Sequence, residues 1–284
     1  MNHLVTLGPE NTYSHEAARR FCAETGISCK IHFEKTITKV FATQQEQQST
    51  FAVVPIENLS EGFVQETLDG LLQFPVYIQR EVLLPIRFSF VANHTDLSSL
   101  EKVYVQTIAY GQCSNFISTL EQSEVVYTNS NIHSLDLLLT SPQRRAGAII
   151  PGHATEKLHS LPTVIPNVNN YKNNTTRFIV LGLCEKNKNP LPEETVKTSV
   201  VVMDNSDHTG ILTSIASAFS SRKINITSII SRPTKEEIGK YHFFIDVSGS
   251  STAPKTAAAL REIQQEFPCK LLGTYPSTEN TTLS

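Results

Sequence analysis

The sequence lacks the features that mark several large classes of protein. No apolar run approaches the roughly 18–20 residues of a membrane-spanning helix. The N-terminus has neither a basic segment nor a long apolar core, so no signal peptide is indicated. Lys and Arg number 24 against 27 Asp and Glu, a net charge of −3, and the basic residues do not cluster. These absences predict a cytoplasmic protein whose partners include no membrane and no nucleic acid.

Motifs for metals and nucleotide cofactors are also missing. The five cysteines are scattered without a Cys-x-x-Cys pair, and the nine histidines show no His-Glu-x-x-His spacing. Neither a disulfide framework nor a metal site is therefore indicated. Gly-x-Gly-x-x-Gly and Walker-type phosphate loops are absent. We expect no metal and no cofactor.

The chain is long enough for two domains. Its 284 residues, 39% apolar and 18% charged, are typical of a globular protein, and a domain commonly has ~150 residues. The clearest break in composition is the polar stretch at residues 185–194, which contains two prolines. We predict a first domain at residues 1–183, a linker at 184–195, a second domain at 196–276 and a flexible tail at 277–284.

In the first predicted domain, short apolar strands alternate with helical segments, which indicates a parallel α/β architecture. The stretch Glu81–Ala92 interrupts this alternation and suits a crossing between two lobes, with a ligand cleft between them. A last strand is expected at Phe178–Leu181. The expected strand and helix pairs are 4–7 with 14–24, 51–55 with 63–72, 102–106 with 111–120, 125–128 with 134–139, and 147–150 with 153–158.

The second predicted domain has the element order βαββαβ, which is that of a ferredoxin-like sandwich. A small sheet with an edge to cover commonly pairs with a second copy, so we expect self-association. The expected elements are a strand at 198–203, a helix at 210–222, strands at 226–231 and 241–247, a helix at 252–267 and a strand at 270–275.

Three polar clusters lie near predicted strand ends, where open α/β sheets bind ligands. They are residues 8–14, 53–58 and 173–178. The first could bind an anion at a helix N-terminus, and Arg177 in the third could bind a carboxylate. The first cluster is equally compatible with a plain Ser N-cap after a Gly-Pro turn, and the second, taken alone, fits an ordinary loop with a capping Asn better than a site. The residues alone indicate a small-anion site in a cleft and no particular reaction.

Taken in order, these clusters resemble the signature blocks of the prephenate dehydratases. The matching residues are Gly8 to Ser14, Val53 to Asn58 with Glu61-Gly62, and Thr176-Arg177-Phe178. The second domain is similar to the ACT regulatory domain of that family, through Gly210-Ile211-Leu212 and Ser231-Arg232-Pro233. The resemblance implies an α/β fold, with a two-lobed catalytic domain like a type II periplasmic binding protein and a ferredoxin-like βαββαβ ACT domain.

The activity that the resemblance implies is the conversion of prephenate to phenylpyruvate, CO₂ and water in L-phenylalanine biosynthesis. Aromatisation drives this reaction, so the protein has mainly to hold two carboxylates and to donate to the departing hydroxyl. By the family's pattern, the catalytic residues are Thr176, Asn58 and Gln112. The implied substrate-binding residues are Thr12, Ser14, Glu57, Ser60, Gly62, Arg177 and Phe178.

The resemblance also implies feedback control by L-phenylalanine, bound between paired ACT domains of a homodimer or homotetramer. Gly210 opens a predicted helix, whose N–H groups suit the carboxylate of the effector. The implied effector-binding residues are Gly210, Ile211, Leu212, Ser231, Arg232 and Pro233.

The chain departs from the family's pattern at Asn11, Leu59, Phe63 and Ile230, and of a further block at residues 105–113, which includes Ile108, only the end survives. Asn11 replaces a glycine, although Asn tolerates a positive φ better than most residues. Three other functions share the fold or chemistry: an arogenate dehydratase, a prephenate decarboxylase and a non-catalytic binder of small anions. The Thr-Arg-Phe block and the ACT domain argue against the decarboxylase, and the retained Thr176 argues against the binder.

Overall fold

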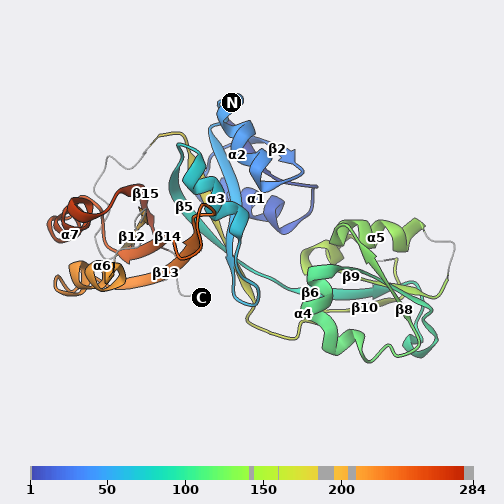
Figure 1. The fold of residues 1–284 in the computed structure, drawn as a ribbon. Coiled ribbons are helices and arrows are strands. Elements are labelled where there is room, and N and C mark those ends of the chain that lie inside the picture. Colours follow the sequence, from blue (N-terminus) through green and yellow to red (C-terminus); the bar gives the residue numbers. More distant parts are fainter. Residues whose placement is uncertain (1, 141–143, 159, 185–194, 204–208, 278–284) are drawn as a thin grey trace.

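The computed structural model describes residues 2–140, 144–158, 160–184, 195–203 and 209–277. These residues form three sheets, and the sheet that contains the N-terminal strand lies between the other two (Figure 1). In the described part of the chain, no helix has both the length and the apolar character needed to cross a membrane. The predicted linker and tail fall almost wholly on residues 185–194 and 278–284, which lie outside the described residues.

The first lobe is a mixed sheet with three helices. Its strand order is β2-β1-β3-β11-β5, with β4 paired to β3; β1, β2 and β3 are parallel, while β11 runs antiparallel to β3 and β5. The elements are β1 (Asn2–Leu7), α1 (Tyr13–Thr25), β2 (Cys29–Glu34), α2 (Ile37–Glu46), β3 (Phe51–Asn58), β4 (Gly62–Phe63), α3 (Gln65–Gln73), β5 (Tyr77–Pro85) and β11 (Thr175–Gly182).

Three elements of the first lobe have no counterpart among the sequence predictions: the edge strand β2, the helix α2 that follows it and the two-residue strand β4. In β2 the apolar Cys29, Ile31 and Phe33 alternate with polar residues, which is the pattern of a half-buried strand, so the signal for this strand was present in the sequence. The helix expected at residues 63–72 begins instead at Gln65, because Phe63 pairs with Glu57 in β4.

The second lobe has the strand order β10-β6-β9-β7-β8, in which β7 is parallel to β8 and β9. The chain enters this lobe between β5 and β6 and leaves it between β10 and β11, which confirms the predicted crossing. The helix expected at 153–158 is a 3₁₀ helix. The elements are β6 (Phe88–Ala92), η1 (Leu97–Ser99), β7 (Lys102–Gln106), α4 (Thr107–Ile117), β8 (Glu124–Thr128), α5 (Asn131–Thr140), β9 (Ala146–Pro151), η2 (Gly152–Lys157) and β10 (Thr163–Ile165).

The third sheet, called the C-terminal sheet below, confirms the predicted order βαββαβ. It is antiparallel, with the strand order β13-β14-β12-β15, and one face packs on its two helices through residues such as Val200, Phe219 and Ile263. The elements are β12 (Val196–Met203), α6 (Ile211–Ser220), β13 (Ile226–Pro233), β14 (Tyr241–Ser248), α7 (Pro254–Glu266) and β15 (Cys269–Pro276).

The other face of the C-terminal sheet packs directly on the first lobe. Val201, Phe244 and Leu272 belong to the same buried apolar cluster as Val54 and Ile179 of the first lobe. The two sheets approach so closely that a Cβ added at Gly273 in β15 would lie 2.3 Å from the carbonyl oxygen of Ile78 in β5. The two regions that the sequence suggests as separate domains therefore share one hydrophobic core.

Candidate active site

A cavity of about 350 Å³ lies between the two lobes. It is lined at the carboxyl ends of β1, β3, β7, β8 and β9, where parallel strands of α/β sheets position ligand-binding loops. Its polar lining residues are Thr12, Ser14, Asn58, Glu61, Gln106, Gln112, Asn129, Ser130, Asn131 and Thr176.

Thr176 and Asn58 form a hydrogen-bonded pair that lines this cavity, in which Thr176 is buried and Asn58 is half-buried. Asn58 ends β3 and Thr176 lies opposite it in β11, and the Nδ2 of Asn58 donates to the Oγ1 of Thr176 over 2.8 Å. The Oδ1 of Asn58 accepts the backbone N–H groups of Ser60, at 2.9 Å, and Glu61, at 3.1 Å, which fixes the direction of the amide. Because Thr176 accepts this hydrogen bond, its own O–H proton remains for an acceptor in the cavity.

Gln112 connects the second lobe to the first. Its side chain is almost fully buried in the middle of α4 and accepts a 2.8 Å hydrogen bond from Asn174, just before β11. Its Nε2 donates to the carboxylate of Glu61 over 3.3 Å. Gln112 thus holds the Glu61 loop and the approach to β11 together across the cleft.

Two helix N-termini, one from each lobe, line the cavity. Thr12 caps α1, where its hydroxyl accepts the N–H of His15 at 3.4 Å. Ser130 precedes α5, and its hydroxyl accepts the N–H of His133 at 3.0 Å. Helix N-termini carry partial positive charge and favour anions. Among the described lining residues Glu61 is the one charged side chain, so these helix ends and neutral donors provide the positive potential of the site.

Seven of the ten residues predicted as catalytic or substrate-binding line the cavity. They are Thr12, Ser14, Asn58, Gly62, Gln112, Thr176 and Phe178. Glu57, Ser60 and Arg177 do not line it. Side chains alternate across a strand, so Asn58 and Thr176 face the cavity while their neighbours Glu57 and Arg177 face the opposite side. Ser60 lies on the exposed loop, where its hydroxyl donates to Asn58 over 2.8 Å.

The sequence predictions missed the contribution of the second lobe beyond Gln112. Residues 129–132 line the cavity directly after β8, and Gln106 does so at the end of β7. The run Asn129-Ser130-Asn131 follows a correctly predicted strand, so the strand-end rule that identified the other clusters also applies here.

Three of the departures from the family's pattern lie at or near the cavity. Asn11 has a φ of 63°, the left-handed conformation that glycine adopts most readily. Phe63 and Ile108 line the cavity and add to its apolar wall. Leu59, at 69% exposure, points away from this cavity.

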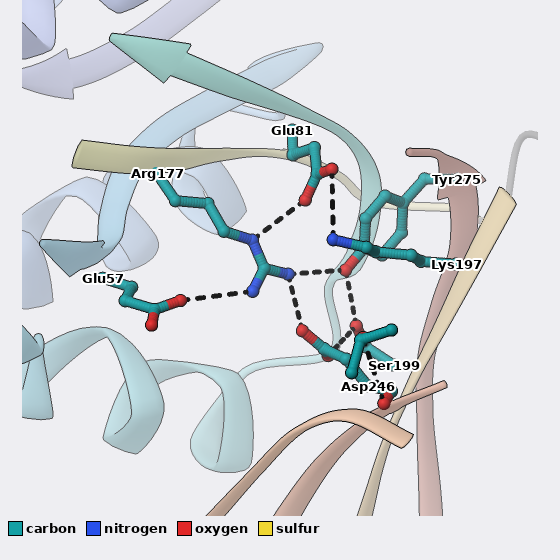
Figure 2. Close-up of polar contacts among 8 residues, drawn as sticks. Glu57, Glu81, Arg177, Lys197, Ser199, Asp246 and Tyr275 are labelled. Atoms are coloured by element: carbon teal, nitrogen blue, oxygen red, sulfur yellow. Dashed lines mark hydrogen bonds and ion pairs between the residues drawn. The ribbon is translucent and has the colours of Figure 1, made fainter. Parts of the chain in front are cut away.

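On the opposite side of β11, Arg177 lies in a buried polar network between the first lobe and the C-terminal sheet (Figure 2). Its guanidinium is 2.9 Å from Glu81, 2.7 Å from Asp246 and 3.6 Å from Glu57, and it donates to the Tyr275 hydroxyl over 2.9 Å. Burial by itself lowers the pKa of a guanidinium, but Tyr275, Asp246 and Glu81 outweigh burial and hold the pKa of Arg177 well above its usual value.

The predicted effector-binding residues lie on two elements of the C-terminal sheet region. Gly210, with a φ of 89°, precedes α6, whose first residues are the buried Ile211 and the exposed Leu212. Ser231, Arg232 and Pro233 end the edge strand β13, where Ser231 and Pro233 are exposed.

Arg232 forms an ion pair with a helix of the first lobe and is only partly exposed. Its Nε and Nη2 donate to the two carboxylate oxygens of Asp69 in α3, both at 3.0 Å. Arg232 is the main cause of the lowered pKa of Asp69. Ile230 packs partly against the apolar cluster shared with the first lobe, so its replacement by glutamate would place a carboxylate at that core.

No group of three His, Cys, Asp or Glu side chains in the described ranges is arranged to hold a metal ion. The chemistry available in the cavity is therefore that of hydroxyls, amides, helix N-termini and one carboxylate.

Comparisons with known proteins agree with this geometry. The prephenate dehydratase family model matches residues 4–186, and the ACT domain model matches residues 199–265. A prephenate dehydratase of Methanocaldococcus jannaschii is 32% identical over 270 residues, which cover 94% of this chain and 96% of that protein.

Solved structures extend the likeness to the whole fold. A prephenate dehydratase from Arthrobacter aurescens in complex with L-Phe has a TM-score of 0.85 at 27% identity, covering 98% of this chain and 90% of that one. A structure described as a quorum quenching acylase has a TM-score of 0.81 at 21% identity, covering 98% of this chain and 99% of that one, and so shows the fold alone. The chain belongs to the prephenate dehydratase family and carries an ACT domain.

Proposed function

We propose that prephenate binds in the cavity between the two lobes and is converted there to phenylpyruvate, CO₂ and water. The observation that carries this proposal is the hydrogen bond from Asn58 to Thr176, which leaves the hydroxyl proton of Thr176 for an acceptor inside the cavity. The fold by itself does not specify a reaction, because one fold hosts many activities. The family membership and the Asn58–Thr176 pair together support the conversion of prephenate as the reaction of this cavity.

The reaction needs little covalent work from the protein. As the bond between the ring and its carboxylate breaks, its electron pair makes the ring aromatic and expels the ring hydroxyl. The departing oxygen takes up a proton and leaves as water, and the carboxylate leaves as CO₂. Thr176 donates a hydrogen bond to the departing oxygen as negative charge develops on it. The donation from Asn58 polarises the Thr176 hydroxyl and makes it a better donor.

The two carboxylates of prephenate are matched to the two helix N-termini in the cavity. The α1 end, with Thr12 and Ser14, belongs to the first lobe, and the α5 end, with Ser130 and Asn131, belongs to the second. Neutral donors and helix dipoles hold anions without a full positive charge that would keep the carboxylate from leaving as CO₂. Arg177 has no place in this binding scheme, since its partners lie on the opposite side of β11.

Turnover of prephenate by the purified full-length chain tests the proposal. Phenylpyruvate should form with wild-type protein, and it should form far more slowly with Thr176→Ala. Arogenate, which differs by an amino group, is assayed in parallel, and preferential turnover of arogenate would reassign the substrate. If the protein converts neither prephenate nor arogenate, the proposed function is contradicted.

We also propose that residues 1–183 form the catalytic domain and residues 196–276 an ACT domain that binds phenylalanine between two copies of the chain. The edge strand β13 carries exposed residues, among them Ile229 at 49% exposure, and its outer edge is unpaired among the described strands. Such an edge is suited to pairing with a second copy. Gly210 and Leu212 at the start of α6 offer N–H groups and an apolar side chain to the effector.

Light scattering and a phenylalanine titration test this second part. We expect a homodimer or homotetramer at micromolar concentration and inhibition of prephenate turnover by phenylalanine. A monomer would contradict the pairing of edges, and activity insensitive to phenylalanine would contradict the regulatory site.

A further inference from the structure

Two adjacent residues of β11 connect the cavity to the C-terminal sheet. Thr176 faces the cavity and Arg177 faces the opposite side, and their backbone positions are joined by one peptide bond. A shift or rotation of the strand at Arg177 therefore displaces Thr176 as well. The position of the Thr176 hydroxyl depends on what holds the Arg177 side chain.

Four strands hold the guanidinium of Arg177. Glu57 and Glu81 approach it from β3 and β5 of the first lobe, while Asp246 and Tyr275 approach it from β14 and β15 of the C-terminal sheet. The shortest contact is the one to Asp246, at 2.7 Å. The shortest contact of this guanidinium thus comes from outside the lobe to which the strand belongs.

The pairing of β11 with β3 is irregular at this position. Arg177 pairs with Glu57, but Phe178 pairs with Pro55, so Ile56 is an extra residue in the register. Such a bulge interrupts the regular ladder and redirects nearby side chains. The pairing of β11 with β5 is regular at Arg177, so on the β3 side the contacts of Arg177 add a side-chain restraint where the ladder is interrupted.

Asp246 is itself held in place. The Ser199 hydroxyl of β12 lies 2.5 Å from its Oδ1 and 2.6 Å from the Tyr275 hydroxyl. Three strands of the C-terminal sheet therefore present a fixed carboxylate and a fixed hydroxyl to Arg177 (Figure 2).

We propose that Asp246, supported by Tyr275, is a positioning residue for catalysis, which acts through Arg177 to hold Thr176 in the cavity. This inference rests on the proposed role of Thr176. It makes the C-terminal sheet part of the structure that sets the turnover rate, in addition to its role as the site of an effector.

The variant Asp246→Asn tests this link with little risk to the fold. The network contains three carboxylates, from Glu57, Glu81 and Asp246, against two cations, Arg177 and Lys197. Replacing Asp246 with the isosteric Asn leaves the remaining charges balanced. Tyr275→Phe is a second variant, which removes one acceptor and keeps the ring in the shared core.

We expect Asp246→Asn to lower kcat by about tenfold or more per folded molecule, since small displacements of a catalytic group are costly, while KM stays within about twofold. Tyr275→Phe should lower kcat less. The methyl resonance of Thr176, assigned by its loss in Thr176→Ser, should shift in both variants. The matched control is Glu262→Gln in α7, which removes the charge of the carboxylate that lies 2.6 Å from Arg222. It should change neither kcat nor the methyl resonance of Thr176.

An unchanged Thr176 methyl resonance in both variants, or an unchanged kcat per folded molecule, would overturn the inference. The methyl measurement needs no turnover, so it tests the mechanical link even if wild-type protein fails to convert prephenate. Failure of the proposed function is recognised separately, by inactivity of the wild-type chain.

Discussion

The two sides of strand β11 differ in the charge of the side chains that they bring together. On the cavity side, Thr176 meets the neutral Asn58, and helix N-termini provide the positive potential. On the opposite side, Arg177 is enclosed by carboxylates and a tyrosine between two packed sheets. A substrate must enter and its products must leave the first side, so the contacts there are those that exchange readily with water.

The second side opens onto a cavity of about 380 Å³ that is lined by Glu57, Glu81, Arg177 and Lys197, and full charges are tolerated there because they are paired. A buried ion network gives little net stability but becomes costly when one partner is removed. In the proposed function the neutral side performs the chemistry, and in the proposed positioning role the charged side determines the geometry.

The largest effect is expected on the charged side. Arg177→Met leaves Glu57, Glu81 and Asp246 with Lys197 as the remaining cation of the network. The free energy of unfolding should fall by about 3–5 kcal/mol, as found when a buried charge loses its partner. Urea unfolding measures this. Arg222→Met, which breaks a partly exposed pair, should cost at most about 1 kcal/mol and is the control.

On the neutral side, Thr176→Ala should reduce turnover and leave stability almost unchanged. Loss of one donor to a developing oxyanion costs about 2.7–4 kcal/mol of activation free energy. Such a contact matters mainly in the transition state, so kcat should fall while KM changes little. Thr176→Ser keeps the hydroxyl and should retain most of the activity. Near-wild-type turnover by Thr176→Ala would refute the assigned mechanism.

Asn58→Asp reverses the hydrogen bond between residue 58 and Thr176, while the side chain at residue 58 keeps almost the same shape. The carboxylate still accepts the N–H groups of Ser60 and Glu61, but it now accepts the Thr176 proton as well. The proton is then unavailable to the substrate, and kcat should fall about a hundredfold. Steady-state kinetics with prephenate check this, and an unchanged kcat would show that Thr176 does not need the amide donor.

A smaller effect is expected where Lys270 of β15 contacts the end of α3. Its ammonium donates to the carbonyl oxygens of Leu71, Leu72 and Phe74 at 2.7, 3.3 and 2.8 Å, and burial lowers its pKa. Lys270→Met leaves these acceptors without their donor and should reduce the free energy of unfolding by about 1–3 kcal/mol. The exposed Lys255 of α7 provides the control Lys255→Met, and equal losses in the two variants would contradict the assignment.

The smallest effect concerns mild acid. Burial lowers the pKa of His242 in β14 below its ordinary value of 6.5, so the unfolded chain binds this proton more readily than the folded protein. The contribution of His242 to stability is therefore fully present above pH 6.5 and declines as the pH falls below that value. His242→Gln should lessen the decline in unfolding midpoint between about pH 7 and about pH 5. Identical pH profiles for variant and wild type would exclude a contribution from His242.

Much of the architecture is readable from local patterns. The buried strands and amphipathic helices, the crossing at Glu81–Ala92 and the βαββαβ order follow from apolar periodicity. The edge strand β2 also carries such a pattern, because Cys29, Ile31 and Phe33 alternate with polar residues, although it is missing from the sequence predictions. Seven of the ten predicted residues line one cavity, because strand ends of a parallel sheet converge whatever the distance between them along the chain.

The sequence by itself determined the family, the order of the elements and the motif residues of the cleft, because these depend on short-range patterns. The tertiary structure alone decided that Arg177 serves the interface and Thr176 the cavity. The partners of Arg177, Asp246 and Tyr275, lie 69 and 98 residues further along the chain, and no local pattern links positions so far apart. They meet because the C-terminal sheet buries its second apolar face on the first lobe, and that packing places a charged network directly behind the strand that carries Thr176.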